Sequence, residues 1–282
     1  MTETPPEQAP KRRRGRPRQD IGAAALNQDR PFVSSLARGM SILRAFQAED
    51  RVLGTQALAD RTGLHKTTVS RLVGTLTQLG YLRYMPEYGK YAVSNQVLTL
   101  GYAVMGRFGF GEMVRNRMED IAQQGECVVA LSVRDRLDMM FVELIRQPTA
   151  NSLSLNVGSR IPMAESAPGR AFLFAADDAE REKLMEELAD FHGNDWENTK
   201  KVELQSALDR MRRQGHSDSF GEWRGEHNAI GIPLHDPFTG DIYTLSVGGN
   251  AHNLSPERLR LEYLPKLFSA AQEIGSLGGG SF

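Results

Sequence analysis

Cysteine is nearly absent from this 282-residue chain, in which Cys127 is the only one. A single thiol excludes an intrachain disulfide and is too few for a zinc site built on cysteines. Because Cys127 lies in an apolar run, we expect a buried small hydrophobe rather than a nucleophile. No stretch of about 18 or more apolar residues occurs, and the N-terminus lacks the apolar segment of a secretory signal. These absences predict a protein of the reducing cytoplasm that has no membrane partner.

The signatures of common enzyme classes are missing as well. The chain contains no G-x-S-x-G, no G-x-x-x-x-G-K-[ST], no G-x-G-x-x-G and no H-E-x-x-H. Asp138, Glu143 and Glu165 do not have the spacing of paired catalytic carboxylates. His227 and His235 lie eight residues apart across a predicted strand, where we expect surface or capping histidines rather than metal ligands. We therefore predict no enzymatic activity, no cofactor and no metal site.

Charge is distributed unevenly along the chain, although the net charge is only −1. Residues 1–100 hold 15 Lys and Arg against 8 Asp and Glu, a net of +7, whereas the remainder holds 19 against 27, a net of −8. With 40% hydrophobic residues the chain can build two cores. This pattern indicates a basic module for a polyanion joined to an acidic module with another task.

The stretch 55–80 predicts two helices joined by a tight turn at Gly63. Apolar residues recur at three-and-four spacing in the second helix and predict one buried face, formed by Val69, Leu72, Val73, Leu76 and Leu79. Thr55 is expected to cap the first helix and is counted with the DNA-facing residues. The opposite side of the second helix carries groups suited to base edges and phosphates, namely His65, Lys66, Thr67, Thr68, Ser70 and Arg71.

The flanks of this pair fit a winged helix. A preceding helix is expected over 34–46, with an apolar stripe of Leu36, Met40, Leu43 and Phe46 and with Arg38 and Arg44 available to phosphates. Residues 82–84 and 91–93 alternate as two short strands, which predicts a hairpin, or wing, directly after the recognition helix. Lys90 and Arg83 are candidate phosphate contacts of that wing.

Residues 1–31 have the composition of a disordered segment. Two interpretations stay open: a solubilising tail, or a second grip on DNA. Arg14-Gly15-Arg16-Pro17-Arg18 resembles an AT-hook, in which arginines enter the narrow minor groove of A·T-rich DNA. Arg14, Arg16 and Arg18 would make those contacts.

A linker helix is expected over 95–111, capped by Ser94 and running to about Phe108. Its apolar stripe, Val97, Leu98, Val104, Met105 and Phe108, has no core of its own. We expect this stripe to pack against the DNA-binding domain and a second subunit; packing only within the chain is the alternative.

Residues 112–278 alternate between helical and strand patterns. Most predicted strands follow one another by hairpins, with helices between them and at the ends, and Ser152–Val157 is expected as a third strand. The chain is thus predicted to be α+β, with domains at 32–94 and 112–278 and an antiparallel sheet flanked by helices in the second. Asp177 with Glu180 predicts a capping box.

Two separate stretches carry a family resemblance. SLARGMSILRAF, TQALADRTGLHKTTVSRLVGTLTQLGYL and YAVS are similar to the winged helix-turn-helix of IclR-type bacterial regulators. VGSRIPMAESAPGRAFL and GIPLHDPFTGDIYTLSVGG are similar to the effector-binding domain of that family. The resemblance implies a GAF-like or profilin-like second domain, binding to a pseudo-palindromic DNA operator as a homodimer or homotetramer, and a small-molecule effector.

The resemblance also implies where that effector binds. The matching positions are the loop Ser166, Ala167, Pro168 and Gly169 and, on later strands, Asp218, Asn228, Ser246 and Gly248. The loop opens a helix, so its N–H groups and positive dipole end suit a carboxylate. Ser246 is expected on the opposite sheet face from Leu245 and Val247. Asp218 would repel an anion unless it is paired, and at Asn228 some family members carry cysteine.

The function predicted from these features is a ligand-responsive transcriptional regulator. The family resemblance implies that it senses a small carboxylate, an aromatic acid being one option. The competing hypothesis is an architectural DNA-binding protein that has no small-molecule effector. It leaves the acidic second domain without a task.

Overall fold

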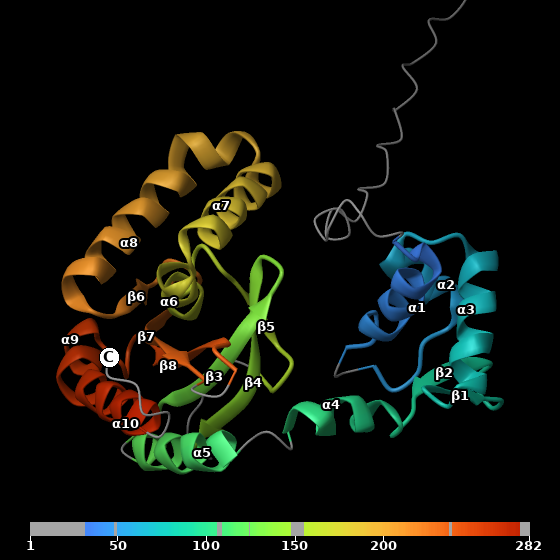
Figure 1. Ribbon diagram of the computed structural model, residues 1–282, viewed down its shortest axis with the longest axis horizontal. Coiled ribbons are helices and arrows are strands. Elements are labelled where there is room, and N and C mark those ends of the chain that lie inside the picture. The colour runs from blue at the N-terminus through green and yellow to red at the C-terminus, as the bar shows by residue number, and fades with distance from the viewer. Residues whose placement is uncertain are drawn as a thin grey trace, which may run out of the picture. The chain divides into compact units, whose positions relative to one another are not determined.

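The structure is a computed structural model that describes residues 32–47, 50–105, 109–123, 125–147, 155–236 and 239–276. The side chains of residues 102–113 and of Asn198 lie outside that description, as does the basic segment that contains Arg14, Arg16 and Arg18. The described residues fall into two compact units, the first ending at Gly101 and the second beginning at Tyr102 (Figure 1).

The first unit is a winged helix-turn-helix, as the sequence predicts (Figure 1). Gly63, at φ 68°, ends the second helix in the left-handed conformation and gives the tight turn between the two helices of the motif. The wing is an antiparallel hairpin in which Leu82 pairs with Val93 and Met85 pairs with Lys90. The elements are α1 (Ser34–Arg44), α2 (Thr55–Thr62), α3 (Lys66–Gln78), β1 (Leu82–Met85) and β2 (Lys90–Val93). The linker helix α4 (Val97–Met105) begins in this unit and extends past its last residue, Gly101.

The core of this unit lies between α1, α2 and α3. Its buried side chains are Ile42, Leu53, Leu58, Ala59, Val69, Val73, Leu76 and Leu82. The predicted stripe of α1 is wrong in its first half, because Leu36 and Met40 are 66% and 45% exposed while Ile42 is fully buried. Only the C-terminal turns of α1 enter the core.

The predicted cap of α2 is also wrong. Gly54 occupies the cap position with extended backbone, and Thr55 is the first residue inside the helix. At the linker helix the Ser94 hydroxyl does accept a hydrogen bond, from the Gln96 N–H at 3.3 Å.

The second unit is built on one antiparallel sheet, which among the described residues has six strands in the order β5-β4-β3-β8-β7-β6. Hairpins join β3 to β4 and β7 to β8, while β3 pairs with β8 at the centre of the sheet. The strands are β3 (Val128–Asp135), β4 (Asp138–Arg146), β5 (Arg160–Pro162), β6 (Ser217–Phe220), β7 (His227–His235) and β8 (Ile242–Asn250).

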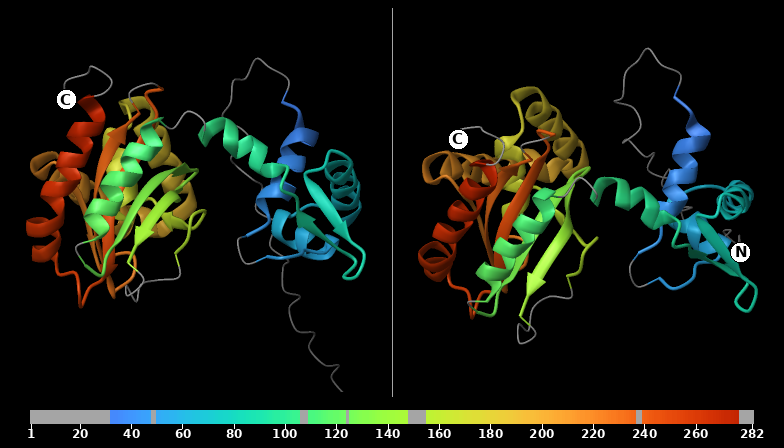
Figure 2. Two further views of the ribbon diagram at one scale, coloured as in Figure 1. Left: turned by 90° about the horizontal axis from the view of Figure 1, so that it is seen from below. Right: turned by 60° about the horizontal axis from the view of Figure 1, so that its bottom comes forward.

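Helices cover both faces of this sheet (Figures 1 and 2). One face packs on α5 (Gly109–Ala122) and α10 (Leu264–Ser276), which α9 (Pro256–Arg258) and a π-helical turn (Leu259–Tyr263) precede. The other face packs on α6 (Ala167–Ala175), with α7 (Asp178–His192), a π-helical turn (Trp196–Lys200) and α8 (Lys201–Gln214) beside it. The predicted α+β class is confirmed, and no helix among the described residues is long and apolar enough to cross a membrane.

Two local predictions in this unit need correction. The described part of the expected strand Ser152–Val157 is a turn, because Asn156 and Ser159 bond to each other and Gly158 adopts φ 88°. The edge strand β5 begins at Arg160, two residues after Gly158. Asp177 caps α7 by accepting from the Glu180 N–H at 2.7 Å, but the Glu180 carboxylate pairs with Arg134 instead of completing the capping box.

Candidate functional sites

The recognition helix α3 presents its polar side to solvent. His65, Lys66, Thr67, Ser70 and Arg71 are exposed, and Thr68 is half-buried. Burial of Val69, Val73 and Leu76 against α1 and α2 fixes which side of the helix faces outward. Leu72 is only half-buried and Leu79, which follows the last helical residue, is 60% exposed, so the buried face is narrower than the sequence predicts.

His65 also has a structural task, because it is the N-cap of α3. Its Nδ1 lies 2.9 Å from the Thr67 hydroxyl and 3.5 Å from the Thr67 N–H. The ring is therefore held at the start of α3 by contacts to Thr67, while its other nitrogen, Nε2, belongs to an exposed side chain.

Basic and aromatic side chains surround the recognition helix. Arg38, Arg44 and Lys90 are exposed, as the sequence predicts, and Arg83 is exposed on β1. The wing also exposes Tyr84 and Tyr88. Thr55 is half-buried at the start of α2. This surface suits a polyanion.

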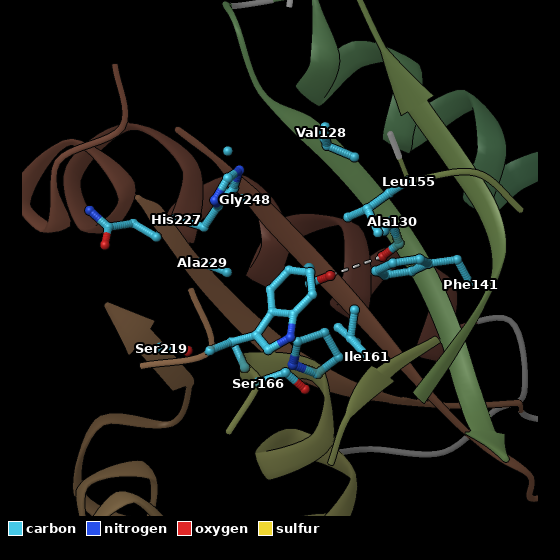
Figure 3. Close-up of a pocket in the computed structure, with 16 residues that line it drawn as sticks. Val128, Ala130, Phe141, Leu155, Ile161, Ser166, Ser219, His227, Ala229 and Gly248 are labelled. Carbon is cyan, nitrogen blue, oxygen red and sulfur yellow. Dashed lines mark hydrogen bonds between the residues drawn. The ribbon is translucent and has the colours of Figure 1, made fainter. Parts of the chain in front are cut away.

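A cavity lies in the second unit between the sheet and the first turn of α6 (Figure 3). The cavity itself measures about 60 Å³, and the empty space reaches about 580 Å³ when the open solvent at its mouth is included. Its walls are mostly apolar, a property typical of small-molecule sites. They are formed by Val128, Ala130, Phe141, Leu155, Ile161, Ser166, Ala167, Pro168, Ser219, Trp223, His227, Asn228, Ala229, Ser246, Gly248 and Gly249.

Six of the eight predicted effector residues line this cavity: Ser166, Ala167, Pro168, Asn228, Ser246 and Gly248. Ser166 is the N-cap of α6, and its Oγ accepts from the Gly169 N–H at 3.3 Å. Its hydroxyl proton can therefore point to a ligand. The positive end of α6 lies at the wall of the cavity, where a negative group is stabilised.

Gly169 does not line the cavity, and its role is in packing. A Cβ at this position would lie 2.1 Å from the carbonyl oxygen of Met163. The absence of a side chain thus lets the first turn of α6 approach the segment after β5. That close approach sets the position of the helix N-terminus.

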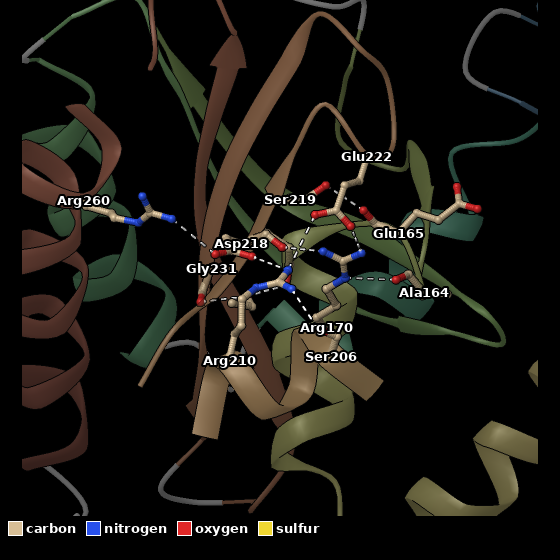
Figure 4. A network of polar contacts seen from close by, with 12 residues as sticks. Ala164, Glu165, Arg170, Ser206, Arg210, Asp218, Ser219, Glu222, Gly231 and Arg260 are labelled. Carbon is tan, nitrogen blue, oxygen red and sulfur yellow. Dashed lines mark hydrogen bonds and ion pairs between the residues drawn. The ribbon is translucent and has the colours of Figure 1, made fainter. Parts of the chain in front are cut away.

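Asp218 also lies outside the cavity, where its buried carboxylate belongs to an ionic network with two arginines that reach the surface (Figure 4). Its carboxylate is 3.0 Å from Arg210 Nη2 and 3.6 Å from Arg260 Nη2, so its charge is balanced. Its backbone oxygen accepts from Arg170 Nη1 at 2.7 Å. Arg170 is 2% exposed and also pairs with Glu222. The network connects α6, α8 and β6, and it engages both the carboxylate and the backbone oxygen of Asp218.

The side chains of Asn228 and Ser246 lie on opposite faces of the sheet. Ser246 faces the cavity, opposite to Leu245 and Val247 in the core under α10, as the alternation predicts. The Asn228 side chain lies on the same face of β7 as Ile230, away from the cavity, and its Nδ2 donates to the Leu254 backbone oxygen at 2.9 Å. Asn228 therefore contributes backbone to the cavity wall, not its amide.

His227 is the polar side chain of β7 that does face the cavity (Figure 3). It is half-buried, and the ring of Trp223 lies 6.3 Å from its own. Its Nδ1 is buried without a hydrogen-bond partner among the described residues. Burial, the largest effect, lowers the pKa of His227 and favours the neutral ring. The prediction of a surface or capping residue is thus wrong for His227, although His235 is exposed.

Sequence reasoning missed the apolar wall of the cavity: Phe141, Leu155, Ile161 and Trp223. They come from four separate segments, and only the fold brings them together. Cys127 is fully buried, as predicted, and burial raises the pKa of its thiol. No group of three or more metal-ligating side chains occurs in the part of the chain that the structure describes.

A winged helix joined to a sheet domain with an apolar cavity is the architecture of a DNA-binding sensor. The family models for the bacterial transcriptional regulator IclR C-terminal domain and for the IclR helix-turn-helix domain match residues 103–276 and 35–86, respectively. The chain belongs to the IclR family of bacterial transcriptional regulators, whose C-terminal domain binds effectors.

Individual relatives agree with this assignment. The HTH-type transcriptional regulator TsaQ1/TsaQ2 of Comamonas testosteroni is 30% identical over 249 residues, which cover 86% of this chain and 87% of that protein. The crystal structure of an IclR family transcriptional regulator from Brucella abortus is 32% identical, with a TM-score of 0.79, covering 90% of this chain and 96% of that one. An IclR homologue from Microbacterium hydrocarbonoxydans complexed with 4-hydroxybenzoate is 21% identical, with a TM-score of 0.68, covering 88% of this chain and all of the other.

Proposed function

We propose that this protein is a transcriptional regulator that binds a pseudo-palindromic operator as a homodimer or homotetramer and responds to a small carboxylate. The observation that carries the proposal is the apolar cavity at the N-terminal end of α6, in a chain that also presents an exposed recognition helix. A carboxylate would accept from the Ser166 hydroxyl and the Ala167 N–H, while its apolar body contacts Phe141 and Trp223.

The DNA-binding half of the proposal depends on the exposed side of α3. Two such helices, one from each subunit, would enter successive major grooves about one helical turn apart. Lys66, Thr67, Thr68, Ser70 and Arg71 would contact bases or phosphates there, together with the His65 ring. Arg38, Arg44, Lys90 and the region around Thr55 would face the phosphate backbone, and Arg14, Arg16 and Arg18 an adjacent minor groove.

The ligand half of the proposal has support from a relative. The homologue from Microbacterium hydrocarbonoxydans binds 4-hydroxybenzoate, a small aromatic carboxylate. The cavity of the present chain has the matching chemistry, since it combines aromatic walls with the positive end of a helix. The ligand must bind more tightly to one of two DNA-binding arrangements, because otherwise it regulates nothing.

The experiment that tests this function has two stages. An operator is first selected from a random duplex library with the purified full chain, and its symmetry is read from the enriched sequences. Aromatic and aliphatic monocarboxylates are then screened by thermal shift, and each stabilising acid is added to the operator complex in a mobility-shift assay. We expect an inverted repeat and at least one acid that changes operator affinity.

Two outcomes would contradict the proposal. Enrichment of A·T-rich duplexes without symmetry, together with no stabilising acid, would favour the architectural alternative. Acids that stabilise the protein but leave operator affinity unchanged would separate ligand binding from DNA control. A variant with Ser166→Ala, which removes the hydroxyl at the helix N-terminus, is the matched control for binding in this cavity.

A further inference from the structure

The cavity has two polar ends with an apolar stretch between them. At one end the first turn of α6 packs on β7 so closely that a Cβ on Gly231 would lie 3.3 Å from Ala167. Gly231 and His227 lie on the same face of β7, four residues apart, which is about 13 Å along a strand. Ala229, between them, adds only a methyl group to the wall.

His227 is the polar group of the second end (Figure 3). Its buried Nδ1 lacks a hydrogen-bond partner among the described residues, and a buried polar atom without a partner destabilises the folded chain. A ligand group placed beside this nitrogen would remove that cost. Two other polar side chains of the wall are already engaged. The Ser219 hydroxyl donates to the Glu165 backbone oxygen at 2.7 Å, and the Ser246 hydroxyl donates to the Ala130 backbone oxygen at 3.4 Å.

We infer that His227 selects the effector by hydrogen bonding to a neutral polar group at the end of the ligand opposite its carboxylate. The preferred ligand class is therefore an acid with a flat apolar body of about one ring and a hydroxyl or carbonyl oxygen at its far end. A two-carbon acid is too short to reach both ends of the cavity. This inference rests on the proposed function, since it presumes a carboxylate at the N-terminus of α6.

The neighbourhood of His227 supports a neutral hydrogen bond rather than an ion pair. Glu226 and Arg224 are the charged groups that act on the ring; Glu226 raises the pKa of His227 and Arg224 lowers it, and burial outweighs both. A neutral imidazole offers one acceptor and one donor nitrogen, so it can accept from a phenol hydroxyl or donate to a carbonyl oxygen.

The test uses the full chain and two pairs of probes that differ by one hydroxyl: benzoate with 4-hydroxybenzoate, and phenylacetate with 4-hydroxyphenylacetate. Dissociation constants are measured by isothermal titration calorimetry at neutral pH. For at least one pair the hydroxylated acid should bind about tenfold more tightly, the factor that corresponds to one well-made buried hydrogen bond.

Variants assign that preference to His227. His227→Leu should reduce the ratio of the two dissociation constants to near one, and His227→Gln, which retains hydrogen-bonding atoms, should keep a preference. His252→Leu is the matched control, because His252 is exposed after β8 and outside the cavity wall. Thermal unfolding of each variant shows that the fold is intact.

The possible failures are distinguishable. If no acid of the wider monocarboxylate screen binds the wild-type chain, the carboxylate cavity of the proposed function is wrong, and this inference falls with it. If other monocarboxylates bind but none of these four does, the carboxylate cavity stands and the ligand class inferred here is wrong. If the acids bind but the hydroxyl makes no difference, or if His227→Leu retains the preference, the carboxylate cavity stands and the role of His227 is wrong.

Discussion

Gly169 shows what a single side chain can decide in this molecule. Alanine is ordinarily better than glycine in a helix, by about 1 kcal/mol. At Gly169, however, a methyl group would lie 2.1 Å from the Met163 carbonyl oxygen, which is backbone and cannot turn aside. The steric cost therefore exceeds the gain in helix propensity.

We predict that Gly169→Ala destabilises the second unit by about 1–3 kcal/mol, the usual range for overpacking. Trp196 and Trp223, the only tryptophans, both belong to that unit, so tryptophan fluorescence during urea unfolding measures it. Gly225→Ala, in the loop before β7 of the same unit, is the matched control, because no heavy atom beyond its chain neighbours lies within 4 Å of its Cβ position. Equal unfolding midpoints for the wild type and Gly169→Ala would contradict the packing role.

Arg71 is the single residue of the DNA-binding domain whose replacement is most informative. It is exposed on α3, and arginine is well suited to the two acceptors of guanine in the major groove. We predict that Arg71→Ala weakens binding to the selected operator by about 1–3 kcal/mol while leaving random DNA less affected. Fluorescence anisotropy with both duplexes measures the difference. An equal loss on both would make Arg71 a phosphate contact.

How far the sequence predicts the ligand site can be judged on two adjacent strands. Alternation placed Ser246 correctly, because its neighbours Leu245 and Val247 are plainly core residues. The same reasoning applied to β7 places Asn228 with Ile230 and Ile232, hence away from the cavity, and leaves His227 facing it. The alternation of apolar residues along β7 is thus a sequence signal that indicates which face His227 occupies. Trp223 and Phe141, by contrast, meet only through tertiary folding, which no local pattern contains.

At the scale of elements, one arginine holds the loop between α1 and α2. Arg61 of α2 donates to the Ala45 backbone oxygen at 2.8 Å, just beyond the last residue of α1, and pairs through both guanidinium ends with Asp50. The hydrogen bond from Arg61 is the largest of the effects that lower the pKa of Asp50. The Asp50 side chain is 15% exposed, so the pair is partly shielded from solvent.

This pair predicts a dependence of stability on pH. A carboxylate whose pKa is lowered by folding stabilises the native state above its unfolded pKa, about 3.9, and loses that contribution as the pH falls through the folded value. Asp50→Asn should therefore exchange amide hydrogens in α2 faster than wild type near pH 7, with the difference shrinking below about pH 4. Glu87→Gln on the wing turn is the control. A difference that persists in acid would contradict the ionic origin.

The linker helix α4 gives the second prediction at this scale. Val97 and Leu98 begin its predicted apolar stripe, and Leu98 is 69% exposed. If this stripe joins two subunits, Val97→Ala with Leu98→Ala should shift the protein toward smaller oligomers in light scattering and weaken the effect of ligand on operator binding. Alanine keeps the helix intact. Thr99→Ala with Leu100→Ala, on the other side, should change neither; equal behaviour of the two double variants would exclude this coupling role.

At the scale of the whole molecule, charge asymmetry separates the two tasks of the chain. Residues 1–100 carry a net of +7, and the basic segment at the N-terminus supplies much of it. The sequence could predict this division and the order of the domains, because both follow from composition and from motifs within one stretch. It could not predict which residues close the effector cavity, since that depends on contacts between distant segments.

The basic segment should therefore be visible in the salt dependence of DNA binding. We predict that deletion of residues 1–31 makes the log–log slope of affinity against salt concentration less steep by about 0.9 for each phosphate that the segment neutralises. Anisotropy titrations of both proteins on one operator at several salt concentrations measure it. If Arg14, Arg16 and Arg18 enter the minor groove, the deletion should weaken binding to an operator with A·T-rich flanks more than binding to one with G·C-rich flanks. An unchanged slope would mean that the segment does not touch DNA.

The alternation of β7 and β8 has a consequence for how such a sensor can change its ligand. Side chains at 227, 229 and 246 face the cavity, while their neighbours along each strand hold the core under α10. Mutations at these three positions alter the lining of the cavity and leave the core under α10 unchanged, because the sheet separates the cavity from that core. New ligand preferences are therefore accessible to drift or to a three-position library with a smaller loss of stability than changes in the core under α10 would cause.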